Sequence, residues 1–164
     1  FKMAMSMLFT MRGIPQLYYG TEILMTGYEH QGHGFIREDF PGGWEGDSIN
    51  AFFFFVRTKE QNEAFNFIKK LMNWRKSNKT VQNGLTTHFI PEDGVYVYFR
   101  ELNDECVMVI INNSKEDQFV DFERFEEITS KYKSAKSVLD RSYLDKLEGF
   151  KVEAKSPAIF ELHK

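Results

Sequence analysis

Residues 13–22 read GIPQLYYGTE, a short apolar segment with a glycine near each end. Before it, residues 1–12 carry apolar side chains around most of a helical circumference, which predicts a largely buried helix. Gly13 and Pro15 end this helix, because glycine accepts the left-handed conformation of a helix cap and proline cannot continue the hydrogen-bonding pattern. The residues Gln16–Tyr19 then predict a strand.

A helix joined to a strand by a tight turn is half of an α/β repeat. A strand of this kind is buried on both faces, so it needs neighbouring strands and covering helices. We therefore expect those elements upstream of Phe1, in a longer polypeptide. The chain begins within an apolar pattern, so its natural N-terminus and any signal peptide are also expected outside these residues.

Between residues 26 and 57 the periodicity is lost in a glycine-rich segment that contains aromatic, acidic and histidine side chains. Loops of this length are usually functional or disordered, and the aromatic content argues against disorder. We expect an ordered loop that shapes a site. Thr58 and Gln61 then form a capping box, and the helical spacing that follows predicts an amphipathic helix ending near Asn78.

From residue 80 onward the apolar residues alternate as they do in strands. Residues 95–100 and 106–111, joined by a turn at Asn103 and Asp104, predict a β-hairpin whose second strand is apolar on both faces. Closely spaced short strands predict a small antiparallel β-sandwich. The further predicted strands are residues 86–90, 118–122, 136–139, 150–154 and 158–162.

The composition excludes few classes of protein. A net charge of −3 over 164 residues gives no reason to expect nucleic acid or a membrane surface as a partner. The apolar stretch at residues 3–11 is interrupted by polar residues and is too short to span a bilayer. Cys106 is the only cysteine, so no internal disulfide can form, and its apolar strand predicts a buried, inert thiol.

The segment at residues 13–22 resembles the eighth-strand motif of the α-amylase superfamily of glycoside hydrolases, Gly-x-Pro-x-x-Tyr-Tyr-Gly-x-Glu. The sequence GHGFIREDFPGGWEGD, followed by NAF and RTKEQNEAF, is similar to the loop after that strand in neopullulanase-like and cyclomaltodextrinase-like members, and SPAIFELHK fits their C-terminal β-sandwich. The resemblance implies an α+β fragment. Residues 1–79 would be the C-terminal remnant of a (β/α)8 barrel, and residues 80–164 an antiparallel β-sandwich. The matching residues are Gly13, Pro15, Tyr18, Tyr19, Gly20 and Glu22.

The resemblance implies a bacterial parent enzyme that hydrolyses α-1,4-linked glucans, such as pullulan, cyclodextrins or starch oligosaccharides, with retention of configuration. One carboxylate attacks the anomeric carbon, and a second carboxyl group protonates the leaving oxygen. In the family these two groups and a third carboxylate, which stabilises the transition state, lie on strands four, five and seven, all expected before Phe1. We therefore expect no catalytic residue in this chain and no activity of the fragment alone.

Arg37 is the residue to which the resemblance assigns contacts with donor-side sugars, and Tyr19, Asp39 and Trp44 complete the predicted substrate-binding set. Arginine donates hydrogen bonds from a planar fork, and aromatic faces stack on sugar rings. A solvated charge cluster is the alternative interpretation of Arg37. Glu22 is predicted to be a structural carboxylate rather than a substrate ligand.

Two other interpretations of the loop are disfavoured. Glu38 and Asp39 are adjacent, whereas a retaining pair must face one bond from about 5 Å apart. His30 and His33, beside Glu29, lack further ligands and a helix to set zinc geometry. We therefore expect no metal or cofactor in this fragment, and the sequence does not decide whether the parent binds calcium.

The expected partners are α-glucan oligosaccharides in the intact parent, the upstream part of the same barrel and, through the exposed remnant of that barrel, other copies of the fragment. The family resemblance places the parent in the bacterial periplasm or cytoplasm. A second hypothesis makes residues 80–164 a non-catalytic β-module. Exposed Tyr96 or Tyr98 rings would indicate sugar binding, and a sheet face packed against the Thr58 helix would indicate a structural role.

Overall fold

The computed structural model describes residues 1–164, apart from the side chain of Gln31. The chain divides into two compact units, one formed by residues 1–15 and 70–164 and the other by residues 16–69. Helix α2 (Lys59–Ser77) contributes to both. The domain boundary at residues 79 and 80 stays a prediction, because it concerns the barrel of a longer polypeptide.

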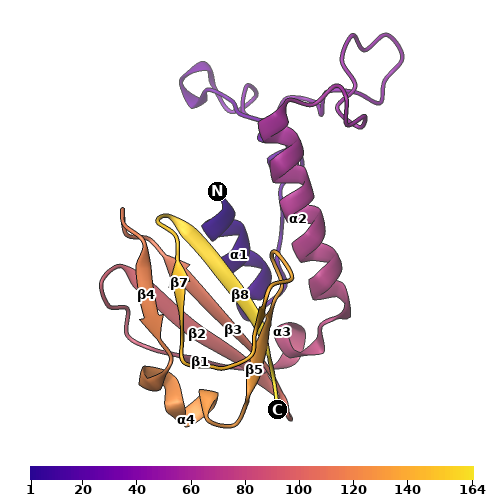
Figure 1. Cartoon of the computed structure of the whole chain (residues 1–164). Helices are drawn as coiled ribbons and strands as arrows, with labels where there is room; N and C mark the ends of the chain where they lie inside the picture. The colour runs from indigo at the N-terminus through magenta and orange to yellow at the C-terminus, as the bar shows by residue number, and fades with distance from the viewer. The chain divides into compact units, whose positions relative to one another are not determined.

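The first unit is built on two antiparallel sheets (Figure 1). Strand β4 (Gln118–Asp121) pairs with β7 (Gly149–Val152) in the smaller sheet. In the larger sheet the order is β1 (Leu85–His88), β2 (Val95–Leu102), β3 (Glu105–Asn112), β8 (Ser156–His163), β5 (Ser134–Ser137) and β6 (Tyr143–Leu144). This arrangement confirms a mostly antiparallel β-domain and places a strand in each predicted range of residues 80–164. Among the described strands, the two-residue β6 alone has no predicted counterpart, because it is too short to show an alternating pattern.

The predicted hairpin is confirmed. Strands β2 and β3 pair from Val95 opposite Asn112 to Leu102 opposite Glu105, and Asn103 turns the chain with a φ of 54°. Asparagine tolerates this left-handed conformation better than most residues. Side chains of β3 are buried on both faces, as its continuous apolar run predicts.

The hydrophobic core lies between the two sheets. Alternate residues of β2, β3 and β8 point into it, and Phe150 of β7 meets Phe160 of β8 with ring centroids 4.9 Å apart. The short helices η3 (Glu123–Phe125) and α4 (Glu126–Thr129) close this core with buried apolar side chains. The principal core residues are Val97, Phe99, Met108, Ile110, Val120, Phe122, Phe125, Val152 and Phe160.

Helix α1 (Lys2–Thr10) lies on the other face of the larger sheet, against β8 and β3 (Figure 1). Its buried residues are Ser6, Phe9 and Thr10, whereas its methionines are only partly covered. The prediction of a largely buried helix is therefore wrong for this chain. One sheet can cover only one side of a helix that is apolar all round.

The strand predicted at residues 16–19 is also absent from the part of the chain that the structure describes. Strand geometry depends on hydrogen bonds to a neighbour, and no described segment pairs with these residues. Beyond them, Gly20 adopts a φ of 82° and begins the short helix η1 (Thr21–Ile23), and η2 (Glu29–Gln31) follows in the long loop.

Helix α2 begins as predicted. The Thr58 amide donates to Gln61 Oε1 at 2.9 Å, and the Gln61 amide donates to Thr58 Oγ1 at 3.2 Å, which is the reciprocal capping box. Asn78 then caps α3 (Lys79–Asn83) by accepting from the Val81 amide at 3.0 Å. Within the described residues, no helix has the length and apolar character to cross a bilayer.

Candidate functional site

Two tyrosines of the motif lie together in the second unit. The rings of Tyr18 and Tyr19 are 4.5 Å apart between centroids, and the Tyr19 hydroxyl donates to the backbone carbonyl of Glu38 at 3.0 Å. This bond ties the motif to the long loop across 19 residues. The two tyrosines, Phe35 and Glu38 line a small cavity of about 70 Å³.

Two charged side chains of the loop, Arg37 and Asp39, act on Tyr19. The pKa of Tyr19 lies above its ordinary value, chiefly because of its hydrogen bond with Tyr18 and then because of partial desolvation. The Asp39 carboxylate raises this pKa further, and the Arg37 guanidinium lowers it. Arg37 and Asp39 flank Glu38, whose carbonyl accepts the Tyr19 hydrogen bond, so both residues lie on the part of the loop that this bond holds.

Trp44 stands apart from these three residues. Its side chain is 72% exposed and does not line the tyrosine cavity. Its amide donates to Asp47 Oδ2 at 2.9 Å, which closes a local turn. The ring is thus available as an exposed apolar face.

Gly20 and Glu22 have distinct environments within the motif. A Cβ on Gly20 would lie 2.3 Å from Met25 Sδ, and the positive φ of Gly20 would strain any larger residue. The Oε2 atom of Glu22 is buried and has no hydrogen-bond partner among the described residues. A structural role for Glu22 therefore depends on a donor outside them.

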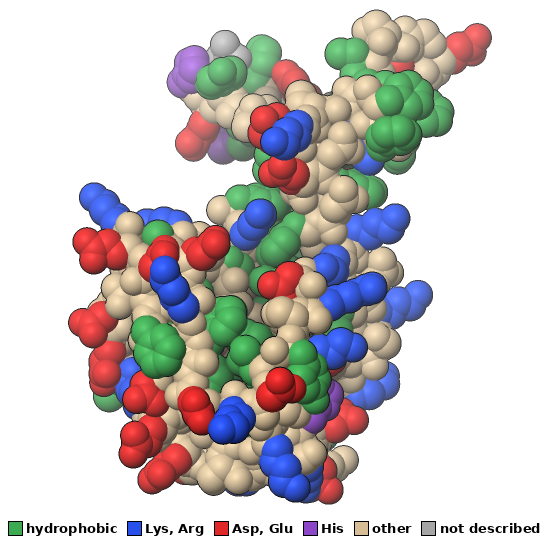
Figure 2. All heavy atoms as spheres, in the orientation of Figure 1, with side chains coloured by type: hydrophobic (Ala, Val, Ile, Leu, Met, Phe, Trp, Pro, Cys, Tyr) green, Lys and Arg blue, Asp and Glu red, His purple; other side chains and the backbone are tan. Residues whose placement is uncertain are grey.

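The loop before α2 exposes an unusual amount of aromatic surface. Phe52–Phe55 are all more than half exposed, and Figure 2 shows hydrophobic side chains gathered on this loop. Arg57 fixes the end of the loop, since it donates to the Ala51 carbonyl at 3.0 Å and to Asn62 Oδ1 at 2.9 Å. The Arg57 guanidinium also lies 4.1 Å from the centroid of the Phe65 ring.

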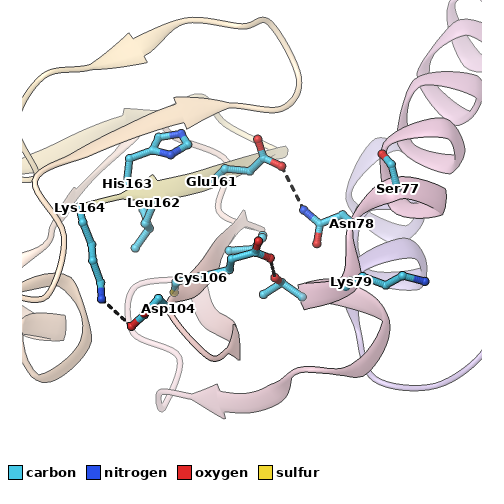
Figure 3. Close-up of a pocket in the computed structure, with 12 residues that line it drawn as sticks. Ser77, Asn78, Lys79, Asp104, Cys106, Glu161, Leu162, His163 and Lys164 are labelled. Atoms are coloured by element: carbon cyan, nitrogen blue, oxygen red, sulfur yellow. Dashed lines mark hydrogen bonds and ion pairs between the residues drawn. The ribbon is translucent and has the colours of Figure 1, made fainter.

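A larger groove of about 530 Å³ lies in the first unit, where the α2–α3 junction faces the β2–β3 turn and the end of β8 (Figure 3). Glu161 accepts hydrogen bonds from Asn78 Nδ2 at 3.0 Å and from Trp74 Nε1 at 2.7 Å. Lys164 pairs with Asp104 across the opening. No sequence pattern indicates this groove, because its walls come from three separate segments of the chain.

The groove contains the single cysteine of the chain. Cys106 lines the groove but is buried, and the pKa of its thiol is raised to about 12, chiefly by desolvation. The burial of this thiol is confirmed, and its inertness stays a prediction, since a thiol with so high a pKa would be protonated at neutral pH. Across the described residues, no three His, Cys, Asp or Glu side chains gather as they would to hold a metal ion.

The comparisons with known proteins agree on one family of enzymes. Residues 86–161 match the family model described as the cyclo-malto-dextrinase C-terminal domain. A cyclomaltodextrin glucanotransferase of Klebsiella oxytoca is 30% identical over 106 residues, which are 65% of this chain and 15% of that protein. A cyclomaltodextrinase of Thermoanaerobacter pseudethanolicus is 27% identical over 119 residues, which are 73% of this chain and 18% of that protein.

The similar solved structures extend the match to the whole chain. The α-amylase of Geobacillus thermoleovorans, complexed with acarbose, aligns over 99% of this chain and 33% of its own, with a TM-score of 0.70 and 25% identity. The cyclomaltodextrin glucanotransferase CldA aligns over 98% of this chain and 31% of its own, with a TM-score of 0.68 and 21% identity. The chain thus spans less than a fifth of the two curated relatives and about a third of these two structures.

Proposed function

We propose that the chain completes a retaining α-glucan hydrolase, because residues 86–161 match the cyclo-malto-dextrinase C-terminal domain and the similar proteins include a cyclomaltodextrinase and an α-amylase. The intact protein acts on α-1,4-linked glucans such as cyclodextrins, pullulan or starch oligosaccharides. Its nucleophile and its acid/base carboxyl group lie upstream of these residues. Residues 1–79 complete the (β/α)8 barrel, and the β-domain covers its outer helices.

The observation that carries the substrate proposal is the hydrogen bond from Tyr19 to the Glu38 carbonyl. This bond holds the motif and the loop together at Glu38, and the exposed residues Arg37 and Asp39 flank that position. Sugars are recognised by this combination, since rings stack on pyranose faces while charged groups bind hydroxyls. Arg37 and Asp39 therefore contact a donor-side glucose unit, and Trp44 supplies a further stacking face from the same loop.

A purely structural β-module is the second candidate, and one observation favours it over a sugar-binding module. Tyr98 is fully buried, and its hydroxyl bonds to Thr10 Oγ1 of α1 at 2.5 Å. Trp74 of α2 bonds to Glu161 on β8. Helices thus cover the sheet face on which a sugar would otherwise stack, so the β-domain serves the enzyme as a scaffold.

The decisive experiment uses the intact polypeptide that carries these residues. We expect it to release sugar from cyclodextrin, and NMR to show that the first product keeps the α configuration. Arg37→Ala should lower kcat/KM about tenfold or more, since one hydrogen bond from a charged donor is lost. Arg124→Ala is the matched control, because this arginine lies on the β-domain and pairs with Glu92.

Three results would contradict the proposal. A β-configured first product would exclude a retaining mechanism. An unchanged kcat/KM in Arg37→Ala would remove Arg37 from the sugar site. Release of reducing sugar by the purified 164-residue chain, in proportion to its concentration, would show that the catalytic groups lie within it.

A further inference from the structure

Among the described residues, two buried arginines of the first unit donate hydrogen bonds to backbone carbonyl groups alone. Arg75 near the end of α2 is 8% exposed. Its Nη1 donates to the Phe9 carbonyl at 2.8 Å and to the Val81 carbonyl at 3.2 Å, and its Nη2 donates to the Gly13 carbonyl at 2.8 Å. One guanidinium thus joins the end of α1, the turn after it and helix α3.

Arg100 on β2 repeats this pattern and is fully buried. Its Nη1 donates to the Thr10 carbonyl at 3.1 Å, and its Nη2 donates to the Gly84 carbonyl at 2.7 Å. Its Nε has no hydrogen-bond partner among the described residues. The fork is therefore oriented by the two carbonyls it joins, at the cost of one unsatisfied N–H group.

No carboxylate in the part of the chain that the structure describes forms an ion pair with either arginine. Burial lowers the pKa of both, that of Arg100 further through its proximity to Arg75. The carbonyls of Phe9 and Thr10 belong to the last turn of α1, where a helix carries partial negative charge. That helix end takes the place of a counter-ion.

We infer that Arg75 and Arg100 form a clamp that fixes the end of α1 and Gly13 on the β-domain, directly before the tyrosine segment in the chain. Gly13 is held by Arg75 in a left-handed conformation with a φ of 112°, and Pro15 restricts the chain directly after it. The clamp therefore defines the point from which residues 16–19 leave the domain. The two arginines are positioning residues, and their link to sugar binding rests on the proposed function.

Amide hydrogen exchange of the 164-residue chain tests the clamp directly. We expect Arg75→Lys to speed exchange at residues 9–13 about tenfold or more, because a lysine cannot reach three carbonyls at once. Arg100→Met should have the same local effect while β3 and β8 stay protected. Arg124→Met is the control, since Arg124 also donates to a backbone carbonyl, that of Ile90, but at the surface.

Two exchange results would overturn the clamp. Unchanged exchange at residues 9–13 in both variants would show that the arginines do not hold this segment. An equal rise across β3 and β8 in both variants would show that they serve general folding instead. The use of two variants keeps the test valid if Arg100→Met alone fails to fold.

The intact polypeptide tests the link to sugar. We expect Arg75→Lys to raise KM for cyclodextrin several-fold while kcat changes less, because it misplaces a binding segment and touches no reacting atom. An unchanged KM beside faster local exchange would overturn the positioning role. A wild-type protein inactive on every α-glucan would refute the proposed function and with it the link to sugar, whereas the clamp itself would still be decided by the exchange data.

Discussion

Asn112 at the end of β3 provides the sharpest test of how the two sheets are held together. Its side chain is fully buried. Its Nδ2 donates to the carbonyls of Glu116, Val152 and Glu153 at 2.9, 3.1 and 3.0 Å, and its Oδ1 accepts from the Ser114 amide at 2.9 Å. One side chain of the larger sheet thus satisfies the end of β7 in the smaller sheet and the loop between β3 and β4.

Asn112→Ala should lower the free energy of unfolding by about 2–4 kcal/mol. Each hydrogen bond contributes about 0.5–1.5 kcal/mol net, and four are lost, although the Glu116 carbonyl keeps a second donor in Ser114 Oγ. Urea denaturation followed by circular dichroism should show the midpoint falling by about 1–2 M with an unchanged slope. The matched control is Asn113→Ala, which removes an exposed contact with Lys155 and should cost less than about 0.5 kcal/mol.

Asn112→Asp adds a change of stability with pH whose direction can be predicted. A buried carboxylate facing three carbonyl oxygens has a folded-state pKa raised above its unfolded value of about 3.9. The Asn112→Asp substitution therefore lowers the free energy of unfolding least below the unfolded pKa, and stability is lost as the pH rises from about 4 toward 7. The reasoning fails if this variant is as stable as Asn112→Ala at pH 7, or if the alanine variants at 112 and 113 have equal effects.

Three further predictions concern single side chains. Burial raises the pKa of the Cys106 thiol to about 12. A disulfide reagent at pH 8 should therefore label the native chain at least about 100-fold more slowly than the urea-unfolded chain, and rapid labelling of the native chain would contradict the burial of this thiol. Burial also raises the pKa of Tyr98 to about 12, so the stability that this residue contributes is complete below its unfolded pKa of about 10 and is lost between pH 10 and 12. Alkaline denaturation should show that Tyr98→Phe loses less stability than the wild type in that range, and an identical profile would exclude Tyr98 as the cause of the alkaline loss. Thr58→Ala should destabilise the start of α2 by about 0.5–2 kcal/mol, which is measured as faster amide exchange in its first turn, whereas Thr58→Ser should retain the cap. Equal exchange in the two variants would show that the hydroxyl does not stabilise this helix.

Local patterns predicted the elements whose stability depends on near neighbours. The capping box at Thr58 needs only residues three positions apart, so its bonds appear as expected. The hairpin needs an alternating pattern and a turn residue such as Asn103, both of which are continuous in the sequence. Strand β3 was predictable as buried on both faces for the same reason.

The candidate sugar site was predicted only through its motif. The sequence indicated Tyr19, Arg37 and Asp39 as members of one site, but the hydrogen bond from Tyr19 to Glu38 depends on how the loop folds back. The prediction of a strand at residues 16–19 is wrong for a related reason. Its pattern is local, whereas a strand also needs a pairing partner, and no described segment supplies one. A period-2 pattern describes one strand, but a sheet requires at least two.

The sequence by itself determined the β-domain, its hairpin, the capped helix and the family that the motif resembles, because each is encoded by neighbouring residues. Only the tertiary structure decided the roles of Asn112, Arg75 and Arg100. In the sequence these are ordinary polar residues, and Arg100 alternates with apolar neighbours as a solvent-facing residue would. Their burial is stable only because carbonyl groups far away in the chain accept their hydrogen bonds, and that arrangement exists only once the chain has folded.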